Sequence, residues 1–176
     1  MEPKLFYEEL SAMGRHTFSI KDLEALLDEL SKKPGSRKLA WDVVVRMLDQ
    51  EDFCVLVCVD SGTRSLDGRS ARIVGMATID FRMFLSGGKG RIEDVVVLES
   101  HRGHGIGKTL VLGLIAIAKK RGAHQVGWGN WNYPIEKIDL TSRRTDERAA
   151  AHKLYESLGF RLRETDVFRF SLGDFE

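Results

Sequence analysis

The stretch Arg102-Gly103-His104-Gly105-Ile106-Gly107 is the most informative part of this chain. It follows an apolar run at 95–98 and leads into a second apolar run at 110–118. This order predicts a strand, a glycine-rich turn and a helix. Glycine permits positive φ angles and a close approach of the backbone to a ligand. Because the first turn of a helix offers unpaired N–H groups and the positive end of the helix dipole, the stretch predicts a phosphate or pyrophosphate site.

Three phosphate-binding patterns can be compared with this stretch. The dinucleotide pattern G-x-G-x-x-G fails from either starting glycine, 103 or 105, because its last position is not glycine. The Walker A pattern fits at 107–109 but lacks its leading glycine, which would stand where Arg102 is. The pattern R-x-x-G-x-G is matched fully by Arg102, Gly105 and Gly107.

A second motif lies toward the C-terminus, where A-A-H-x-L-Y-x-x-L-G-F occupies 150–160. Apolar residues recur there every four positions, which predicts a helix over 146–158 with one apolar face. Gly159 is a typical residue to follow a helix end. Phe160 is expected to start the next segment of extended chain, and residues 163–170 have the alternation of a final strand.

Together the two motifs resemble the GNAT superfamily, the acyl-CoA-dependent N-acetyltransferases, over about residues 70–172. The resemblance implies an α/β fold in a single domain, 1–176, with a mixed central sheet of about six to seven strands flanked by helices on both faces. It implies acetyl-CoA as co-substrate and a primary amine as acceptor, with direct transfer of the acetyl group. The acceptor could be a small amine, an amino-sugar phosphate or a protein amine.

The resemblance also indicates which residues would hold acetyl-CoA. The glycine loop would bind the pyrophosphate, mostly through backbone N–H groups, and the preceding strand would pair with the pantetheine arm. The expected cofactor-binding residues are Val95, Val96, Val97, Arg102, Gly103, His104, Gly105, Ile106, Gly107, Lys108 and Ser142.

Two residues are expected to be catalytic. Tyr155 matches the family tyrosine that protonates the leaving sulfur, and a phenol with an ordinary pKa near 10 suits that role. Glu93 is the expected general base, acting directly or through water, with Asp94 as the rival. The structural alternatives are a packed helix tyrosine and a carboxylate paired with Arg72 or Arg82.

Regular alternation along this strand makes a specific geometric prediction. It places Glu93, Val95 and Val97 on one face, and Ile92, Asp94 and Val96 on the other. An acid inside a buried strand is costly unless it is paired or used, which favours a role for the carboxylate at 93.

Composition fits one globular enzyme domain. The chain has 176 residues, 43% hydrophobic and 30% charged, with a formal net charge of +1. This balance argues against nucleic acid or an anionic membrane as the main partner. No apolar stretch approaches the ~20 residues of a membrane span, and the N-terminus lacks a signal-peptide pattern, so we expect a cytoplasmic protein.

The two cysteines, Cys54 and Cys58, are expected to be buried thiols in a reducing compartment. Four positions apart in one strand, they would lie about 13 Å apart, too far for a disulfide. No histidine pair has zinc-ligand spacing with a carboxylate or thiol, so no metal is expected.

The coarse organisation alternates strands and helices. The expected strands are 4–10, 53–59, 71–84, 92–98, 137–142 and 163–170, with Gln125 as an alternative start of the fifth strand. The expected helices are 19–32, 36–50 (starting at 36 or 37), 107–121 and 146–158, with a hairpin turn at 86–90. The aromatic segment 123–135 is either a surface loop or a wall of the acceptor site.

Two other functional classes stay open at this stage. A CoA-binding sensor or scaffold would keep the cofactor loop without turnover, and a P-loop-like protein would bind a nucleotide through 107–109. GNAT domains often pair, but no residue identifies a homodimer interface. The segments 90–97 and 102–108 also resemble glucosamine-6-phosphate N-acetyltransferases.

Overall fold

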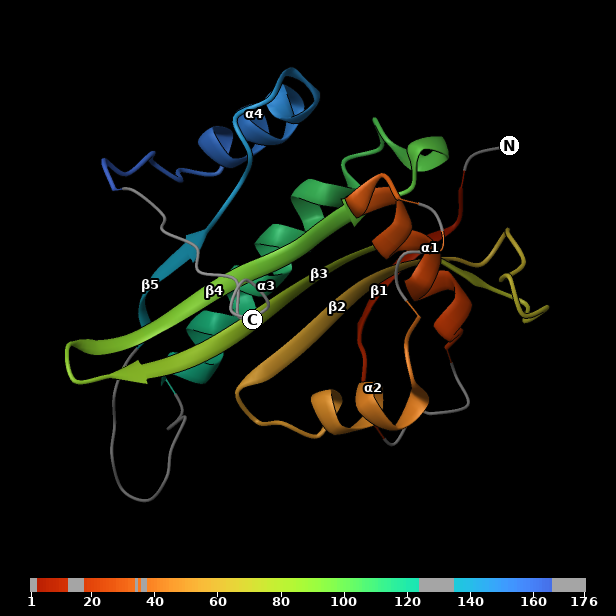
Figure 1. The fold of residues 1–176 in the computed structure, drawn as a ribbon, viewed down its shortest axis with the longest axis horizontal. Helices are drawn as coiled ribbons and strands as arrows, with labels where there is room; N and C mark the ends of the chain where they lie inside the picture. Colours follow the sequence, from red (N-terminus) through yellow and green to blue (C-terminus); the bar gives the residue numbers. More distant parts are fainter. Residues whose placement is uncertain (1–2, 13–17, 34, 36–37, 124–134, 166–176) are drawn as a thin grey trace, which may run out of the picture. The chain divides into compact units, whose positions relative to one another are not determined.

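The computed structural model describes residues 3–12, 18–33, 35, 38–123 and 135–165. The chain divides into two compact units, residues 1–142 and residues 143–176. In the first unit the described elements are β1 (Leu5–Glu9), α1 (Ile20–Ser31), α2 (Trp41–Leu48), β2 (Phe53–Asp60), β3 (Arg72–Phe84), β4 (Gly87–Val97), α3 (Ile106–Ala123) and β5 (Ile135–Leu140) (Figure 1).

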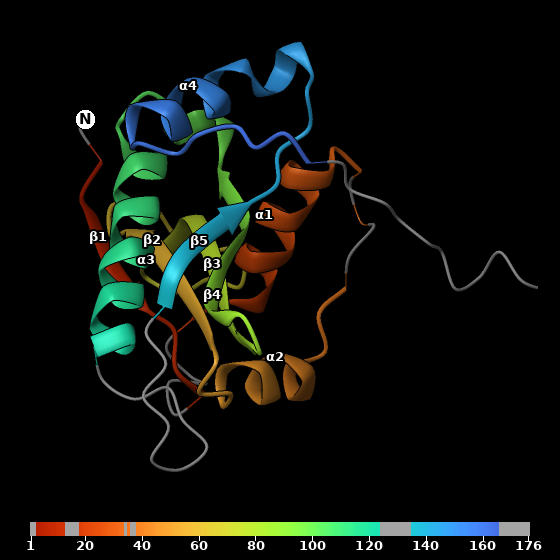
Figure 2. The same ribbon diagram turned by 90° about the vertical axis from the view of Figure 1, so that its left-hand side faces the viewer.

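One five-stranded sheet in the order β1-β2-β3-β4-β5 forms the centre of the first unit. Strands β1 to β4 pair antiparallel in sequence order, and β5 joins β4 in parallel. The mixed sheet confirms the predicted fold class, whereas the described residues contain five strands rather than six to seven. In Figure 2, α3 lies along one face of the sheet and α1 lies against the other.

Helix α1 follows directly from its sequence. The Ser19 side chain caps it by accepting a hydrogen bond of 3.3 Å from the Asp22 N–H. Leu23 and Leu26 are buried in the core between the helix and the sheet, and the helix ends at Lys32 in a left-handed conformation (φ +57°). The predicted helix 19–32 is therefore confirmed to within a residue at each end.

Helix α3 packs closely on the opposite face. A Cβ on Gly75 of β3 would stand only 3.0 Å from Ile106 Cγ2 and 3.3 Å from Leu110 Cδ1. Both of these α3 side chains are fully buried. The missing side chain at 75 thus lets the first turn of α3 rest directly on the sheet, close to the end of the glycine loop.

Several predicted boundaries are corrected. Helix α2 spans Trp41–Leu48, well inside the predicted range 36–50, and residues 38–40 are not helical. The β3–β4 turn consists of residues 85–86 alone, since Phe84 already pairs with Gly87, so the glycines predicted as turn lie in β4.

The ends of two further elements also move. Helix α3 continues to residue 123, beyond the predicted end at 121. Strand β5 covers 135–140 rather than 137–142. The residues between them, 124–134, hold most of the aromatic segment and lie outside the described residues.

The second unit contains a short 3₁₀ turn, Asp146–Arg148, followed by α4 (Ala149–Ser157). The predicted helix 146–158 therefore has a tighter first turn than an α-helix. Residues 160–165 are not in a strand, and the rest of the predicted final strand lies outside the described residues.

Both cysteines are buried free thiols in β2, as predicted. Burial raises the pKa of Cys54 to about 12 and that of Cys58 to about 11. Strand β2 lies between β1 and β3, so it is an inner strand of the sheet.

Candidate active site

Strand β4 carries a bulge at the point where the general base was predicted. Asp94 has a φ of +48°, a left-handed conformation that few residues other than glycine adopt. The register pairs Thr78 with Glu93 and Met76 with Val96, so two β4 residues stand opposite the single residue Ala77.

The bulge corrects the predicted face of Glu93. Residues 94 and 95 together occupy one position of the register. The partners of Glu93 and Val96 on β3 are two residues apart and share a face, so Glu93 and Val96 lie on the same face instead of on opposite faces. Val96 belongs to the core that includes Leu23 and Leu26 of α1. Glu93 therefore faces the α1 side of the sheet, where it is partly exposed rather than deeply buried.

Just before the bulge, β4 stops pairing with β5. The parallel pairing runs from Gly88↔Ile135 to Ile92↔Leu140, and within the described residues it does not reach 93–97. The backbone of Val95, Val96 and Val97 thus borders an edge that another extended chain can join. This is the stretch for which the sequence predicted pantetheine pairing.

The glycine loop has the predicted turn geometry. Gly103 and Gly105 have φ angles of +83° and +74°, and a Cβ at either position would have no neighbour within 4 Å. Helix α3 then begins at the buried Ile106, and its first intrahelical bonds include Thr109 N–H to the Gly105 carbonyl at 3.0 Å. Residues 106–108 therefore present N–H groups at a helix N-terminus, as an anion site requires.

Polar and basic side chains lie on and beside this loop. Lys108 and His104 are exposed, and the His104 Nδ1 lies 3.1 Å from the Arg102 carbonyl and 3.3 Å from the His101 carbonyl. The Arg102 guanidinium donates from Nε to the Val97 carbonyl at 3.2 Å and from Nη2 to the Glu29 carboxylate of α1. Arg102 is thus already bound to two protein groups.

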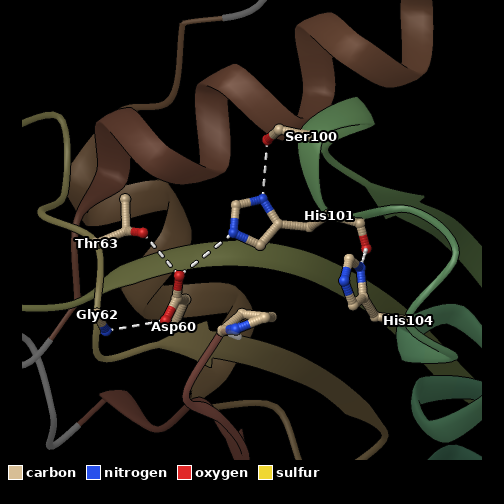
Figure 3. Close-up of a pocket in the computed structure, with 7 residues that line it drawn as sticks. Asp60, Gly62, Thr63, Ser100, His101 and His104 are labelled. Atoms are coloured by element: carbon tan, nitrogen blue, oxygen red, sulfur yellow. Dashed lines mark hydrogen bonds and ion pairs between the residues drawn. The ribbon is translucent and has the colours of Figure 1, made fainter. Parts of the chain in front are cut away.

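A buried carboxylate anchors the segment just before the loop. Asp60, at the end of β2, lies 3.3 Å from His101 Nε2, and His101 Nδ1 lies 2.8 Å from Ser100 Oγ (Figure 3). Asp60 also accepts hydrogen bonds from the Thr63 hydroxyl at 2.7 Å and from the backbone N–H groups of residues 62 and 4.

These donors have a clear electrostatic effect. The Thr63 hydroxyl, then the Gly62 N–H and His101, hold the pKa of the Asp60 carboxyl below its usual value, in spite of burial. A hollow of about 300 Å³ lies beside this cluster. Sequence reasoning missed Asp60; its only signal was an acid that closes a buried strand directly before the turn Ser-Gly-Thr.

The partner of Glu93 differs from both predicted partners. Its carboxylate Oε1 accepts from Nε of Arg91, two residues earlier on the same strand. Arg82 instead contacts Asp80 at 3.1 Å. Arg72 lies 3.9 Å from Asp22, so neither predicted arginine reaches Glu93.

In the second unit, the end of α4 fixes Tyr155. The Gly159 N–H bonds the Glu156 carbonyl at 3.0 Å, and the Phe160 N–H bonds the Tyr155 carbonyl at 3.0 Å. With Gly159 at φ +88°, this is a Schellman end. The Tyr155 and Phe160 rings meet edge to face at 6.1 Å, which explains the L-G-F that follows the tyrosine.

The predicted residues divide between the two units. Glu93, the glycine loop and Ser142, which follows β5 and is partly buried, belong to the first unit, and Tyr155 belongs to the second. His152 lies three residues before Tyr155 and places its Nε2 3.0 Å from the Arg143 carbonyl.

The described residues contain neither a cluster of metal ligands nor a membrane-spanning helix. Across the described ranges, no three His, Cys, Asp or Glu side chains are arranged to hold a metal ion. No helix in that part of the chain is both long enough and apolar enough to cross a membrane.

Comparison with known proteins places this geometry in a class. The family model of the GNAT acetyltransferases matches residues 19–160, which is most of the chain. The chain therefore belongs to the GNAT acetyltransferase family, a family of acyl-transferring enzymes. This confirms the resemblance drawn from the glycine loop and the C-terminal motif.

Individual relatives are more specific. The chain is 35% identical over 101 residues to a glucosamine 6-phosphate N-acetyltransferase of Trypanosoma brucei brucei, covering 56% of this chain and 57% of that protein. The match thus spans little more than half of the relative's length.

Solved structures share the fold at lower identity. An aminoglycoside acetyltransferase from an uncultured soil metagenomic sample has a TM-score of 0.72 at 19% identity, covering 96% of both chains. Glucosamine-6-phosphate N-acetyltransferase from Arabidopsis thaliana has a TM-score of 0.64 at 19% identity, covering 95% of this chain and 98% of that chain.

Proposed function

We propose that this chain is an N-acetyltransferase of one domain that moves the acetyl group of acetyl-CoA directly to a primary amine. The observation that carries the proposal is a continuous path along β4 and the loop after it. The path runs from the bulge, through 95–97, which lie beyond the β5 pairing seen in the described residues, into the glycine loop and α3. Such a path offers an extended backbone for an amide-containing arm and a helix N-terminus for its phosphates.

The residues on this path fit acetyl-CoA. The glycine loop would hold the pyrophosphate by its N–H groups, because no side chain stands over Gly103 or Gly105. Lys108 would add positive charge, and the edge at 95–97 with Ser142 would bind the arm. When bound, acetyl-CoA supplies an acyl group already activated as a thioester, so the chain needs to orient it and to move protons.

Tyr155 is the proposed proton donor to the leaving sulfur. Its position is fixed by the helix end and by the Phe160 ring, which limits the rotamers that its phenol can adopt. We assign it as the proton donor from the motif A-A-H-x-L-Y-x-x-L-G-F, in which it holds the family tyrosine's place.

Glu93 is the proposed base that accepts the proton of the amine, directly or through water. One carboxylate oxygen is bound by Arg91, and within the described residues the other accepts no hydrogen bond. Asp94 on the bulge is the alternative base, since it is exposed at the same stretch of strand.

Direct transfer is supported by the state of the thiols. Cys54 and Cys58 are buried, and their raised pKa values of about 12 and about 11 leave almost no thiolate at neutral pH. A covalent acyl intermediate needs a thiolate nucleophile, so neither cysteine suits that role.

For the acceptor we propose an amino-sugar phosphate. Asp80 pairs with Arg91, and Arg82 pairs with Lys89, in the register of the β3–β4 hairpin. Paired residues and residues two apart in a strand share a face, so these four side chains lie on the same face as the candidate base Glu93. This face therefore carries three cations and two anions. The excess of positive charge favours an anionic amine over a cationic peptide. The trypanosome relative acts, by its name, on glucosamine 6-phosphate.

The first test is thermal unfolding of the purified chain with acetyl-CoA and, separately, with Mg-ATP. A ligand at about a hundred times its Kd stabilises by about 2.7 kcal/mol, which is a shift of several degrees for a domain of this size. We expect a shift with acetyl-CoA alone. A shift with Mg-ATP alone would indicate a P-loop-like nucleotide binder and contradict the proposal.

Thiol release in the presence of glucosamine 6-phosphate, glucosamine or a lysine peptide then measures transfer. Release with glucosamine 6-phosphate is expected to exceed the other two. Tyr155→Phe should lower kcat about 10²-fold and leave acetyl-CoA binding unchanged. Acetyl-CoA binding without release from any amine would favour the sensor or scaffold.

The two carboxylates are separated by their own variants. If Glu93 is the base, Glu93→Gln lowers kcat more than Asp94→Asn does, and the loss is smaller at high pH, where more of the amine is already neutral. The reverse order of the two losses would assign the base to Asp94.

A further inference from the structure

Helix α1 contacts the glycine loop directly. Glu29, in its last turn, accepts a charge-assisted hydrogen bond from Nη2 of Arg102, a residue 73 positions away in the sequence. The Arg102 side chain is half exposed, and the Glu29 side chain is mostly covered. The arginine of R-x-x-G-x-G is therefore paired with a carboxylate of the protein itself.

The arginine has a second attachment that keeps it beside the loop. Its Nε donates to the Val97 carbonyl, the last residue of β4, at 3.2 Å. A guanidinium has several N–H donors in a fixed plane, so it can exchange one carboxylate for another oxyanion while Nε stays bound. An incoming phosphate would compete with Glu29 for the outer edge of this plane.

Glu29 is well placed to release the arginine. The Lys32 ammonium lies 2.8 Å from the same carboxylate oxygen, Oε1. The pKa of Glu29 is lowered first by Lys32, ahead of Arg102. If Arg102 turns to another anion, Lys32 remains to compensate the carboxylate, so the loss of the Glu29–Arg102 pair is inexpensive.

The other carboxylates of α1 have different partners. Asp22 accepts from the backbone N–H groups of Leu66 and Ile73, and Glu24 accepts from the Leu39 N–H at 2.8 Å. These bonds fix α1 to the loop before β3, to β3 itself and to the segment before α2. Asp28 accepts from the Gly35 N–H at 2.7 Å. Of the four carboxylates of α1, Glu29 is the one that the structure shows in contact with the glycine loop.

We propose that Glu29 is a built-in competitor of the cofactor: it holds Arg102 in the ligand-free protein and yields it to the pyrophosphate of CoA on binding. Glu29 thereby lowers the affinity for CoA, and Lys32 partly relieves that effect. The inference rests on the proposed function, because it needs CoA to bind at the glycine loop. It adds a residue outside the motif that sets the affinity of that loop.

Calorimetric titration with CoA tests this at about 150 mM salt, where long-range fields are screened beyond about 8 Å. Glu29→Gln should bind CoA about two- to fivefold more tightly than the wild type, the range expected for a partly exposed pair. Lys32→Met should bind CoA more weakly. Glu24→Gln, the same exchange on the same helix, should leave the Kd unchanged.

A double-mutant cycle separates competition from a simple charge effect. In an Arg102→Gln background, Glu29→Gln should no longer change the Kd, because the contested guanidinium is gone. A persisting gain in that background would overturn the inference, since the carboxylate would then act through its field alone. Thermal unfolding without ligand checks that each variant is folded.

The remaining outcomes are also decisive. Weaker CoA binding by Glu29→Gln would make Glu29 a support that holds Arg102 for the ligand, and an unchanged Kd would leave it no role; either result overturns the inference and leaves the proposed function standing. If the folded wild type binds no CoA, the proposed function fails, and the inference fails with it.

Discussion

At the scale of single residues, two buried carboxylates act in opposite directions. Asp60 has several donors, and its pKa lies below the usual value. Asp22 is buried in α1, and burial raises its pKa in spite of two backbone hydrogen bonds. The contribution of Asp60 to the free energy of unfolding is therefore present above its unfolded pKa of 3.8 and is lost as pH falls through its lowered folded pKa. The contribution of Asp22 is present below 3.8 and is lost as pH rises through its raised folded pKa.

We predict that Asp60→Asn lowers the free energy of unfolding at pH 7 by about 1–3 kcal/mol, because one acceptor oxygen is lost among buried donors. The wild type loses the Asp60 contribution as pH falls below 3.8 through the lowered folded pKa, so the difference should shrink at pH 3. Urea unfolding at both pH values measures it.

The matched control is Asp42→Asn, which removes a carboxylate from an exposed i,i+4 pair with Arg46 on α2. Such a pair contributes little, so the control should unfold almost as the wild type does. If Asp60→Asn and Asp42→Asn have the same stability at pH 7, the anchoring role of Asp60 is wrong.

At the scale of elements, the bulge of β4 decides how the site is built. It turns Glu93 toward α1, and it lies where β4 stops pairing with β5. The bulge depends on the left-handed conformation of Asp94, which is costly for most side chains and free for glycine.

We predict that Asp94→Gly keeps the stability of the wild type to within about 1 kcal/mol. Asp94→Val should lose about 1–2 kcal/mol more than Asp94→Gly, because a β-branched side chain resists φ near +48°. The midpoints of guanidinium unfolding compare the two variants. Equal midpoints would mean that the bulge has another conformation in solution.

At the scale of the whole molecule, the two compact units raise the question of cooperativity. Residues 143–176 number fewer than the ~40 that usually fold alone without disulfides or metals, and α4 has only nine residues. We therefore predict that the chain unfolds as one domain.

Differential scanning calorimetry of the full chain tests this prediction. A single transition should appear, with the calorimetric and van't Hoff enthalpies of unfolding equal. Two resolved transitions, or a van't Hoff enthalpy well below the calorimetric one after a reversibility check, would indicate that the second unit melts independently.

Features specified by neighbouring residues could be predicted from the sequence, whereas the face of Glu93 and the length of α2 could not. Local signals predicted α1 through its Ser19 cap, the glycine loop through its composition, and the end of α4 through Gly159, and the structure confirms all three. Alternation failed at Glu93, because it assumes a regular strand, and an aspartate, although it tolerates a positive φ, does not by itself indicate a bulge. Helix α2 was predicted too long, because its periodic apolar positions lie only within 41–48 and the extension on either side had no apolar periodicity to support it.

What the sequence alone determined about this protein is its family and the order of its motifs. These are local: a strand, a glycine turn and a helix are specified by neighbouring residues through backbone sterics and hydrogen bonds. The tertiary structure alone decided the face of Glu93, its partner Arg91, the Asp60–His101 anchor and the Glu29–Arg102 pair. The last two join residues 41 and 73 positions apart, and such contacts exist only once the sheet and helices have packed.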